Sequence, residues 1–145
     1  SSRLGEALLH KARLFLFSGQ VSRAADTASA AVERVKGSPL ALADANEVLA
    51  EALELMGQVG DARAARRAAT DILLASGGKG GTALVRLLMA ESVACAKTSD
   101  IKHALQLAEE GLRRAIDCYG ANHLVVVDAH IHVAKIHDDA NAHTL

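Results

Sequence analysis

The chain has 145 residues, enough for one domain with a hydrophobic core, and 50% of them are hydrophobic although only 2% are aromatic. Alanine and leucine dominate and there is one proline, so the composition favours closely packed helices over a sheet, which prefers β-branched and aromatic residues. The formal net charge of −1 supplies no overall field that would attract nucleic acid or an anionic membrane.

The sequence contains neither an apolar run long enough to span a bilayer nor the layout of a signal peptide. We therefore expect an intracellular, cytoplasmic protein. The two cysteines, Cys95 and Cys118, are too few for a disulfide framework or a zinc cluster. Both are expected to be reduced residues of a helical core.

Apolar residues recur at helical spacing in seven segments, which predicts seven helices. These are expected over residues 4–17, 22–35, 40–56, 61–75, 82–97, 101–119 and 124–137. Ser22, Ser38 and Thr82 stand where N-caps are expected, because their hydroxyls can accept a hydrogen bond from a first-turn N–H. Pro39 suits the first turn of its helix, where its missing N–H costs nothing.

The glycine-rich stretch 77–82 contains Lys79 and has to be compared with a phosphate-binding loop. Such a loop follows a strand and has Ser or Thr directly after its lysine. Here a helix is expected before the stretch, and Gly80 follows the lysine. A flexible linker is the better interpretation.

One turn recurs three times: an aliphatic residue, two others, and then an alanine, at Ala24, Ala62 and Ala104. Around each alanine the same side-chain sizes return: a small residue twelve positions before, a bulkier one nine before, and a small one seven after. The three sets are Ala12, Phe15 and Ala31; Ala50, Leu53 and Ala69; and Ser92, Cys95 and Gly111. Small side chains at matched heights let antiparallel helices approach closely, which predicts repeated helical hairpins over 4–37, 38–78 and 82–120, with a partial unit over 122–145.

This pattern resembles the tetratricopeptide repeat, which has a small–bulky pair on its first helix and alanines on its second. The units exceed that family's usual length of about 34 residues, and the run Tyr119 to Leu124 is similar to a junction of the long repeats of kinesin light chains, with Leu124 in place of a proline. The resemblance implies an all-α fold in a single domain. It further implies a right-handed superhelix of antiparallel helix pairs, about three and a half repeats long, whose first helices line a concave groove that binds protein partners.

Projecting the repeats onto helices gives the residues expected to bind a partner in that groove. They are Arg13, Asp44, Glu47, Glu51, Glu54, Arg86, Met89, Val93, Lys97, Asp128, Ile131 and Lys135. The four carboxylates of segment 40–56 fall within about 80° of each other and would attract a basic segment of a partner. They could equally be solvated, or be paired with Arg13 and Arg86. Such a groove suits an extended peptide or a helix.

The chaperone-tail version of these repeats requires lysine and asparagine on successive first helices. Leu9, Glu47 and Glu51 occupy the comparable places, so that partner class is not expected.

Segment 124–137 is apolar on much of its surface, whereas terminal repeats have a polar outer face. Two interpretations are open. The chain is a fragment of a longer array, or the apolar face associates with another copy or a partner. The second gives an alternative function, a structural element that stacks or dimerises through this helix.

Five of the seven histidines lie late in the chain, among several aspartates, so a metal-binding domain is a remote alternative. His130 and His137 share a helix face but are about 10.5 Å apart along the axis, too far to bind one ion. Asp128 and His132 could share an ion only with ligands from elsewhere. Neither a metal nor a cofactor is predicted.

Short basic faces occur around Arg66 and at Arg113-Arg114, without aromatic side chains on which bases could stack. Nucleic acid is therefore not an expected partner. No serine or cysteine has a sequence context that would activate it as a nucleophile, so we expect no enzymatic activity.

Overall fold

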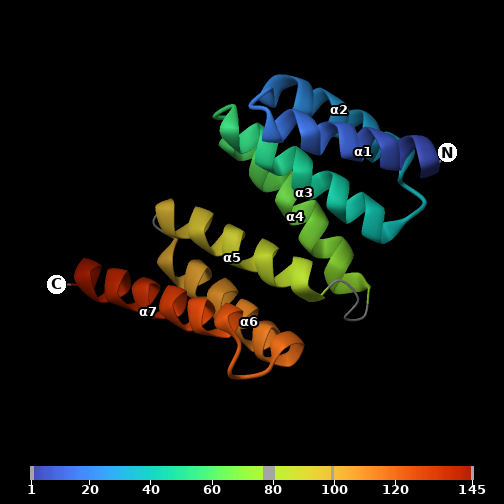
Figure 1. Cartoon of the computed structure of the whole chain (residues 1–145). Helices are drawn as coiled ribbons and strands as arrows, with labels where there is room; N and C mark the ends of the chain where they lie inside the picture. Colours follow the sequence, from blue (N-terminus) through green and yellow to red (C-terminus); the bar gives the residue numbers. More distant parts are fainter. Residues whose placement is uncertain (1, 77–80, 99, 145) are drawn as a thin grey trace. The chain divides into compact units, whose positions relative to one another are not determined.

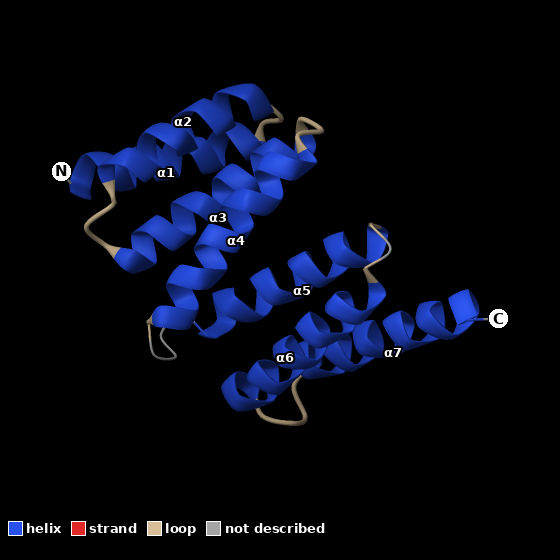
Figure 2. Cartoon of the chain, turned by 180° about the vertical axis from the view of Figure 1, so that it is seen from behind, coloured by secondary structure: helices blue, strands red, loops and turns tan. Residues whose placement is uncertain are grey.

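The computed structural model describes residues 2–76, 81–98 and 100–144, of which residues 2, 143 and 144 are described by their backbone alone. Over these residues the chain is entirely helical and contains no strand (Figures 1 and 2). The helices are α1 (Ser2–Phe17), α2 (Val21–Arg34), α3 (Pro39–Leu55), α4 (Val59–Ala75), α5 (Gly81–Lys97), α6 (Ile101–Tyr119) and α7 (Leu124–Thr144). The prediction of an all-α chain with seven helices is confirmed, and α7 extends beyond its expected end.

The chain forms two compact units, one containing α1 to α4 and the other α5 to α7. Consecutive helices pack against each other within each unit, α1 on α2 and α3 on α4 in the first, and α5 on α6 in the second. This packing is compatible with a helical repeat. The single domain and the superhelix implied by the resemblance stay predictions.

The core of the first unit is made largely of alanine with a few aliphatic residues. One cluster joins α1, α2 and α3 through Leu9, Ala12, Ala28, Ala31, Val35, Ala45 and Val48. Gly5 of α1 faces Val35 so closely that a Cβ built on the glycine would be 2.3 Å from the Val35 Cγ1 atom. Ala12 and Ala31 of the repeat pattern are fully buried in this cluster, which is compatible with the predicted close packing of neighbouring helices.

The second unit is built in the same way around α6. One cluster joins Cys95, Ala104, Ala108 and Ile136, and a second joins Val85, Ala115 and Val126. Gly111 is buried, and a Cβ on it would be 2.8 Å from the Met89 Cε atom of α5. Both α5 and α7 pack against α6, whose buried residues are all small: Ala104, Ala108, Gly111 and Ala115.

In the three recurring turns, one residue has the same backbone conformation. The residue before each second helix has nearly the same dihedral angles: Gln20 (φ −86°, ψ 67°), Gln58 (φ −87°, ψ 69°) and Asp100 (φ −88°, ψ 67°). Its N–H donates to the carbonyl five residues earlier, at 2.8, 2.9 and 3.1 Å. Gly19 and Gly57 have φ near +80°, a conformation that favours glycine.

Two of the three expected N-caps are wrong. Ser22 and Thr82 lie inside α2 and α5, because the helices begin at Val21 and Gly81. Ser38 does precede α3 as expected, with Pro39 in the first turn, but its hydroxyl makes no capping hydrogen bond.

The cysteines differ in their surroundings. Cys95 is buried as predicted, whereas Cys118 is exposed, so its placement in the core was wrong. It lies near the end of α6 beside Gly81, on the surface of the hairpin. The predicted linker lies mostly outside the described residues. None of the helices, over the residues described, combines the length and the apolarity that a bilayer crossing requires.

Candidate partner-binding groove

A groove runs between α5 and α7 of the second unit, and we call it the α5–α7 groove. It consists of two adjoining cavities of about 410 and 350 Å³ that share Val93 and His132. The first is lined by Val85, Arg86, Met89, Ala90, Val93, Val125, Asp128, Ala129 and His132. The second is lined by Val93, Ala96, Lys97, His132, Lys135, Ile136 and Asp139.

Helical spacing explains why these side chains share the groove. On both helices they recur every three or four residues, so they form one stripe on the facing side of each helix. Six of the predicted binding residues lie in it: Arg86, Met89, Val93 and Lys97 of α5, and Asp128 and Lys135 of α7. Ile131 does not line either cavity and is 50% exposed. The binding role of all these residues stays a prediction.

The groove has an apolar middle and charged ends. Valine, alanine and methionine side chains line most of the first cavity, with Arg86 and Asp128 at its margin. Two lysines, Lys97 and Lys135, border the second cavity together with Asp139. Val93, at the junction of the two cavities, is 40% exposed although it is apolar. The arrangement offers an apolar strip to a bound segment and polar groups that would fix its direction.

His132 lines both cavities of the groove, although the sequence suggested it only as a possible metal ligand. Its Nε2 atom is 3.0 Å from the Ser92 Oγ atom, and the Ser92 hydroxyl donates to the Ala104 carbonyl at 2.7 Å. Because that hydroxyl has only one proton, we infer that the His132 Nε2–H donates to Ser92 and that Nδ1 is the acceptor. Burial lowers the pKa of His132, and the nearby Lys135 lowers it further, which favours the neutral ring at pH 7.

Arginine side chains neutralise part of the negative charge of the four predicted carboxylates of α3, which are Asp44, Glu47, Glu51 and Glu54. Arg13 of α1 is 3.8 Å from the Asp44 carboxylate, with both side chains about half exposed. Glu54 pairs with Arg66 of α4. Glu47 is partly buried and Glu51 is exposed. Pairing with Arg13, one of the interpretations open from the sequence, therefore applies to Asp44, whereas the pairing of Glu54 with Arg66 was not expected.

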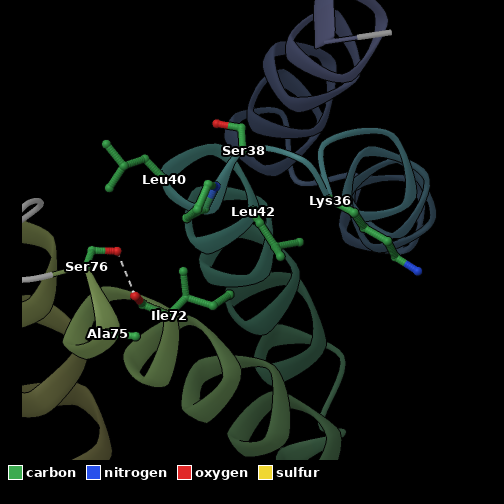
Figure 3. A pocket seen from close by; sticks show the side chains of 8 residues that line it. Lys36, Ser38, Leu40, Leu42, Ile72, Ala75 and Ser76 are labelled. Atoms are coloured by element: carbon green, nitrogen blue, oxygen red, sulfur yellow. Dashed lines mark hydrogen bonds between the residues drawn. The ribbon is translucent and has the colours of Figure 1, made fainter.

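A further cavity of about 590 Å³ lies in the first unit, between the start of α3 and the end of α4 (Figure 3). Leu40, Leu42 and Ile72 form its apolar walls. The Ser76 hydroxyl on its edge donates to the Ile72 carbonyl at 2.8 Å, so this polar group is used within its own helix. No predicted binding residue lines this cavity.

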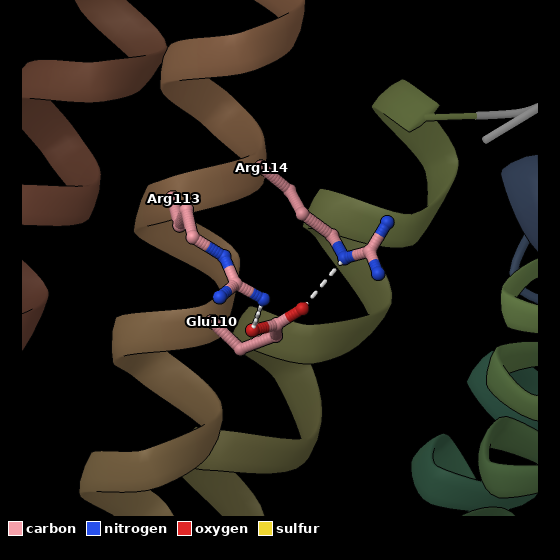
Figure 4. A network of polar contacts seen from close by, with 3 residues as sticks. All are labelled: Glu110, Arg113 and Arg114. Carbon is pink, nitrogen blue, oxygen red and sulfur yellow. Dashed lines mark hydrogen bonds and ion pairs between the residues drawn. The ribbon is translucent and has the colours of Figure 1, made fainter.

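The basic pair of α6 is also engaged. Glu110 lies between Arg113 and Arg114, with the Arg114 Nε atom 2.8 Å from the Glu110 Oε1 atom (Figure 4). The hydrogen bond from Arg113, followed by that from Arg114, holds the pKa of Glu110 below its ordinary value despite the opposing effect of burial. This carboxylate offsets part of the positive charge that a nucleic acid would require.

The late histidines have separate environments. His123 stacks on Tyr119 with ring centroids 4.6 Å apart, and His137 is 3.9 Å from the Glu109 carboxylate. The side chain of His143 lies outside the described residues. Over the part of the chain that is described, no three histidine, cysteine, aspartate or glutamate side chains converge as metal ligands.

A comparison with models of known protein families gave no match, and a comparison with curated proteins gave none either.

Proposed function

We propose that this chain is a non-enzymatic interaction module that binds a segment of a partner protein in the α5–α7 groove. The observation that carries the proposal is the continuous apolar strip in that groove, interrupted in the middle only by His132 and bordered by charges at its ends. The resemblance to tetratricopeptide repeats supports it, because α5 and α7 are the first helices of the third repeat and of the partial fourth repeat in the predicted pattern. The superhelix and the cytoplasmic location expected from the sequence belong to the same proposal.

A strip of this kind can hold either an amphipathic helix or an extended peptide. Each apolar side chain that a partner buries there would contribute about 1.5–3 kcal/mol before the cost of ordering the segment. Two or three such anchors give a moderate affinity, as is usual for a groove that binds short segments. The polar ends contribute more to the direction of binding than to its strength.

Val93 is the best single residue with which to test the groove. It lines both cavities and is 40% exposed, so a charged replacement should interrupt the apolar strip without disturbing the core. Ile116 of α6 is a matched control, since it is an aliphatic residue that is 38% exposed and does not line the groove. The two variants are Val93→Glu and Ile116→Glu.

Peptides would be selected from a random library against the wild-type chain, and their Kd measured by fluorescence anisotropy for the wild type and both variants. We expect Val93→Glu to weaken binding at least about tenfold, equivalent to about 1.4 kcal/mol. Ile116→Glu should bind as the wild type does. Equal weakening by both variants, or none by Val93→Glu while circular dichroism shows both folded, would contradict the proposal.

A further inference from the structure

The helix α7 has a second surface, which does not line the α5–α7 groove. Leu124, Val127 and Ile131 are 77%, 46% and 50% exposed, and they follow each other at intervals of three and four residues. They therefore form one stripe along the helix, which we call the α7 stripe. Over the described residues, no other helix contributes three exposed apolar side chains in such a row.

Two opposite charges border the α7 stripe. Asp128 and Lys135 are exposed and seven residues apart, so they lie on the same side of the helix, about 20° apart around its axis. Their separation along the axis is about 10.5 Å, which is too long for an ion pair between them. Neither forms an ion pair or a side-chain hydrogen bond with another residue that the structure describes.

The acid and the base of one α7 helix can pair with the base and the acid of a second, antiparallel copy. If a second copy of α7 lies antiparallel on the stripe, with the two-fold axis beside Ile131 and His132, residue 128 of each copy comes opposite residue 135 of the other. Both ion pairs form at once, and the two Ile131 side chains meet at the axis. A parallel arrangement would place Asp128 opposite Asp128 and Lys135 opposite Lys135, which is unfavourable.

We propose that the α7 stripe is a self-association surface, on which two copies of this chain pair through antiparallel α7 helices. The interface is isologous, as is usual in two-fold symmetric dimers. The apolar residues supply the attraction, and the Asp128–Lys135 pairs set the direction and register. Three exposed apolar side chains make a small contact, so the dimer is expected to be concentration-dependent.

Exchanging the charges tests the proposal directly, because the contact between residues 128 and 135 would form twice in the dimer. Asp128→Lys places two lysines opposite each other at both ends of the contact, and Lys135→Asp does the same with two aspartates. Each variant should be monomeric. An equimolar mixture of the two should form a heterodimer, since both contacts then join opposite charges, and the double variant Asp128→Lys/Lys135→Asp should dimerise as the wild type does.

The oligomeric state would be measured by sedimentation equilibrium of the 145-residue chain from about 5 µM to about 500 µM, a range that covers weak association. Circular dichroism would show that each variant is folded, which is expected because both residues are exposed. A wild type that stays monomeric over this range would overturn the proposal. So would a mixture of the single variants that does not associate.

Disulfide trapping distinguishes the two orientations. In a Cys118→Ser background, Ile131→Cys should form a disulfide-linked dimer, since residue 131 lies beside the axis. Leu124→Cys should not, because the two copies of residue 124 would be about 22 Å apart along the helix. Efficient trapping through Leu124→Cys would indicate a parallel pair and contradict the proposed surface geometry.

Discussion

The close approach of Gly5 to Val35 makes a sharp prediction about the stability of the first unit. Replacing an exposed helical glycine by alanine ordinarily stabilises a protein by up to about 1 kcal/mol, because alanine has the higher helix propensity. At Gly5 the new Cβ would lie 2.3 Å from the Val35 Cγ1 atom and 3.3 Å from the Arg34 Cβ atom. A separation of 2.3 Å is too short for two carbon atoms, so α1 or Val35 would have to move.

The valine cannot easily give way. Val35 is 3% exposed, and its β-branched side chain has little rotational freedom. Overpacking of this kind costs about 1–3 kcal/mol. After the gain in helix propensity, we expect Gly5→Ala to lower the free energy of unfolding by about 1–2 kcal/mol.

Gly60 provides the matched control, because it also lies in the first turn of a helix but has no atom within 4 Å of a built Cβ. Gly60→Ala should leave the stability unchanged or raise it slightly. Urea unfolding followed by far-UV circular dichroism measures both. If Gly5→Ala were as stable as Gly60→Ala, the close contact between α1 and Val35 would not exist and the packing argument would fail.

Three further predictions concern the second unit and the recurring turns. The folded-state pKa of His132 lies below its ordinary value, so as the pH falls the imidazole is protonated in the unfolded chain before it is protonated in the folded chain. The free energy of unfolding should therefore decrease below about pH 6.5. His132→Gln should reduce that decrease, measured by urea unfolding at several pH values. Ser92→Ala removes the hydroxyl that bonds the Ala104 carbonyl and should cost about 1 kcal/mol in the same assay. Gln58 has the backbone conformation of Asp100, whose carboxylate caps α6, so Gln58→Asp should raise the thermal midpoint, and an unchanged or lower midpoint would show that the turns are not equivalent.

The sequence predicted the helices and turns well because both depend on local signals. Apolar periodicity located all seven helices, and Gly19 and Gly57 mark turns that require a positive φ. The caps were predicted less well. Gln20 and Gln58 occupy the N-cap positions, but their side chains make no capping hydrogen bond, so backbone hydrogen bonds close these turns.

The sequence was less informative about which residues line the α5–α7 groove, because the groove depends on contacts between residues far apart in the chain. The repeat register brought Arg86, Val93 and Lys97 to one stripe, because that stripe follows from helical spacing alone. His132 could not be found in the same way, since its partner Ser92 lies forty residues earlier on another helix. Only the fold brings the two together.

Ile131 shows the limit of the repeat register. It aligns with Met89, which packs over Gly111 of the paired helix α6. Among the described residues α7 has no such paired helix after it, and Ile131 is half exposed instead of lining the groove. Aligning the repeats predicts which positions correspond, but the burial of a side chain depends on which neighbouring helices are present.

The most direct test of the account is a map of the amide chemical shifts of the chain on titration with a selected peptide. If the α5–α7 groove is the binding site, the largest shift changes will fall on the facing stripes of α5 and α7, around Val93 and His132. Changes confined to α1–α4, or to the α7 stripe around Leu124 and Val127, would show that the partner binds elsewhere.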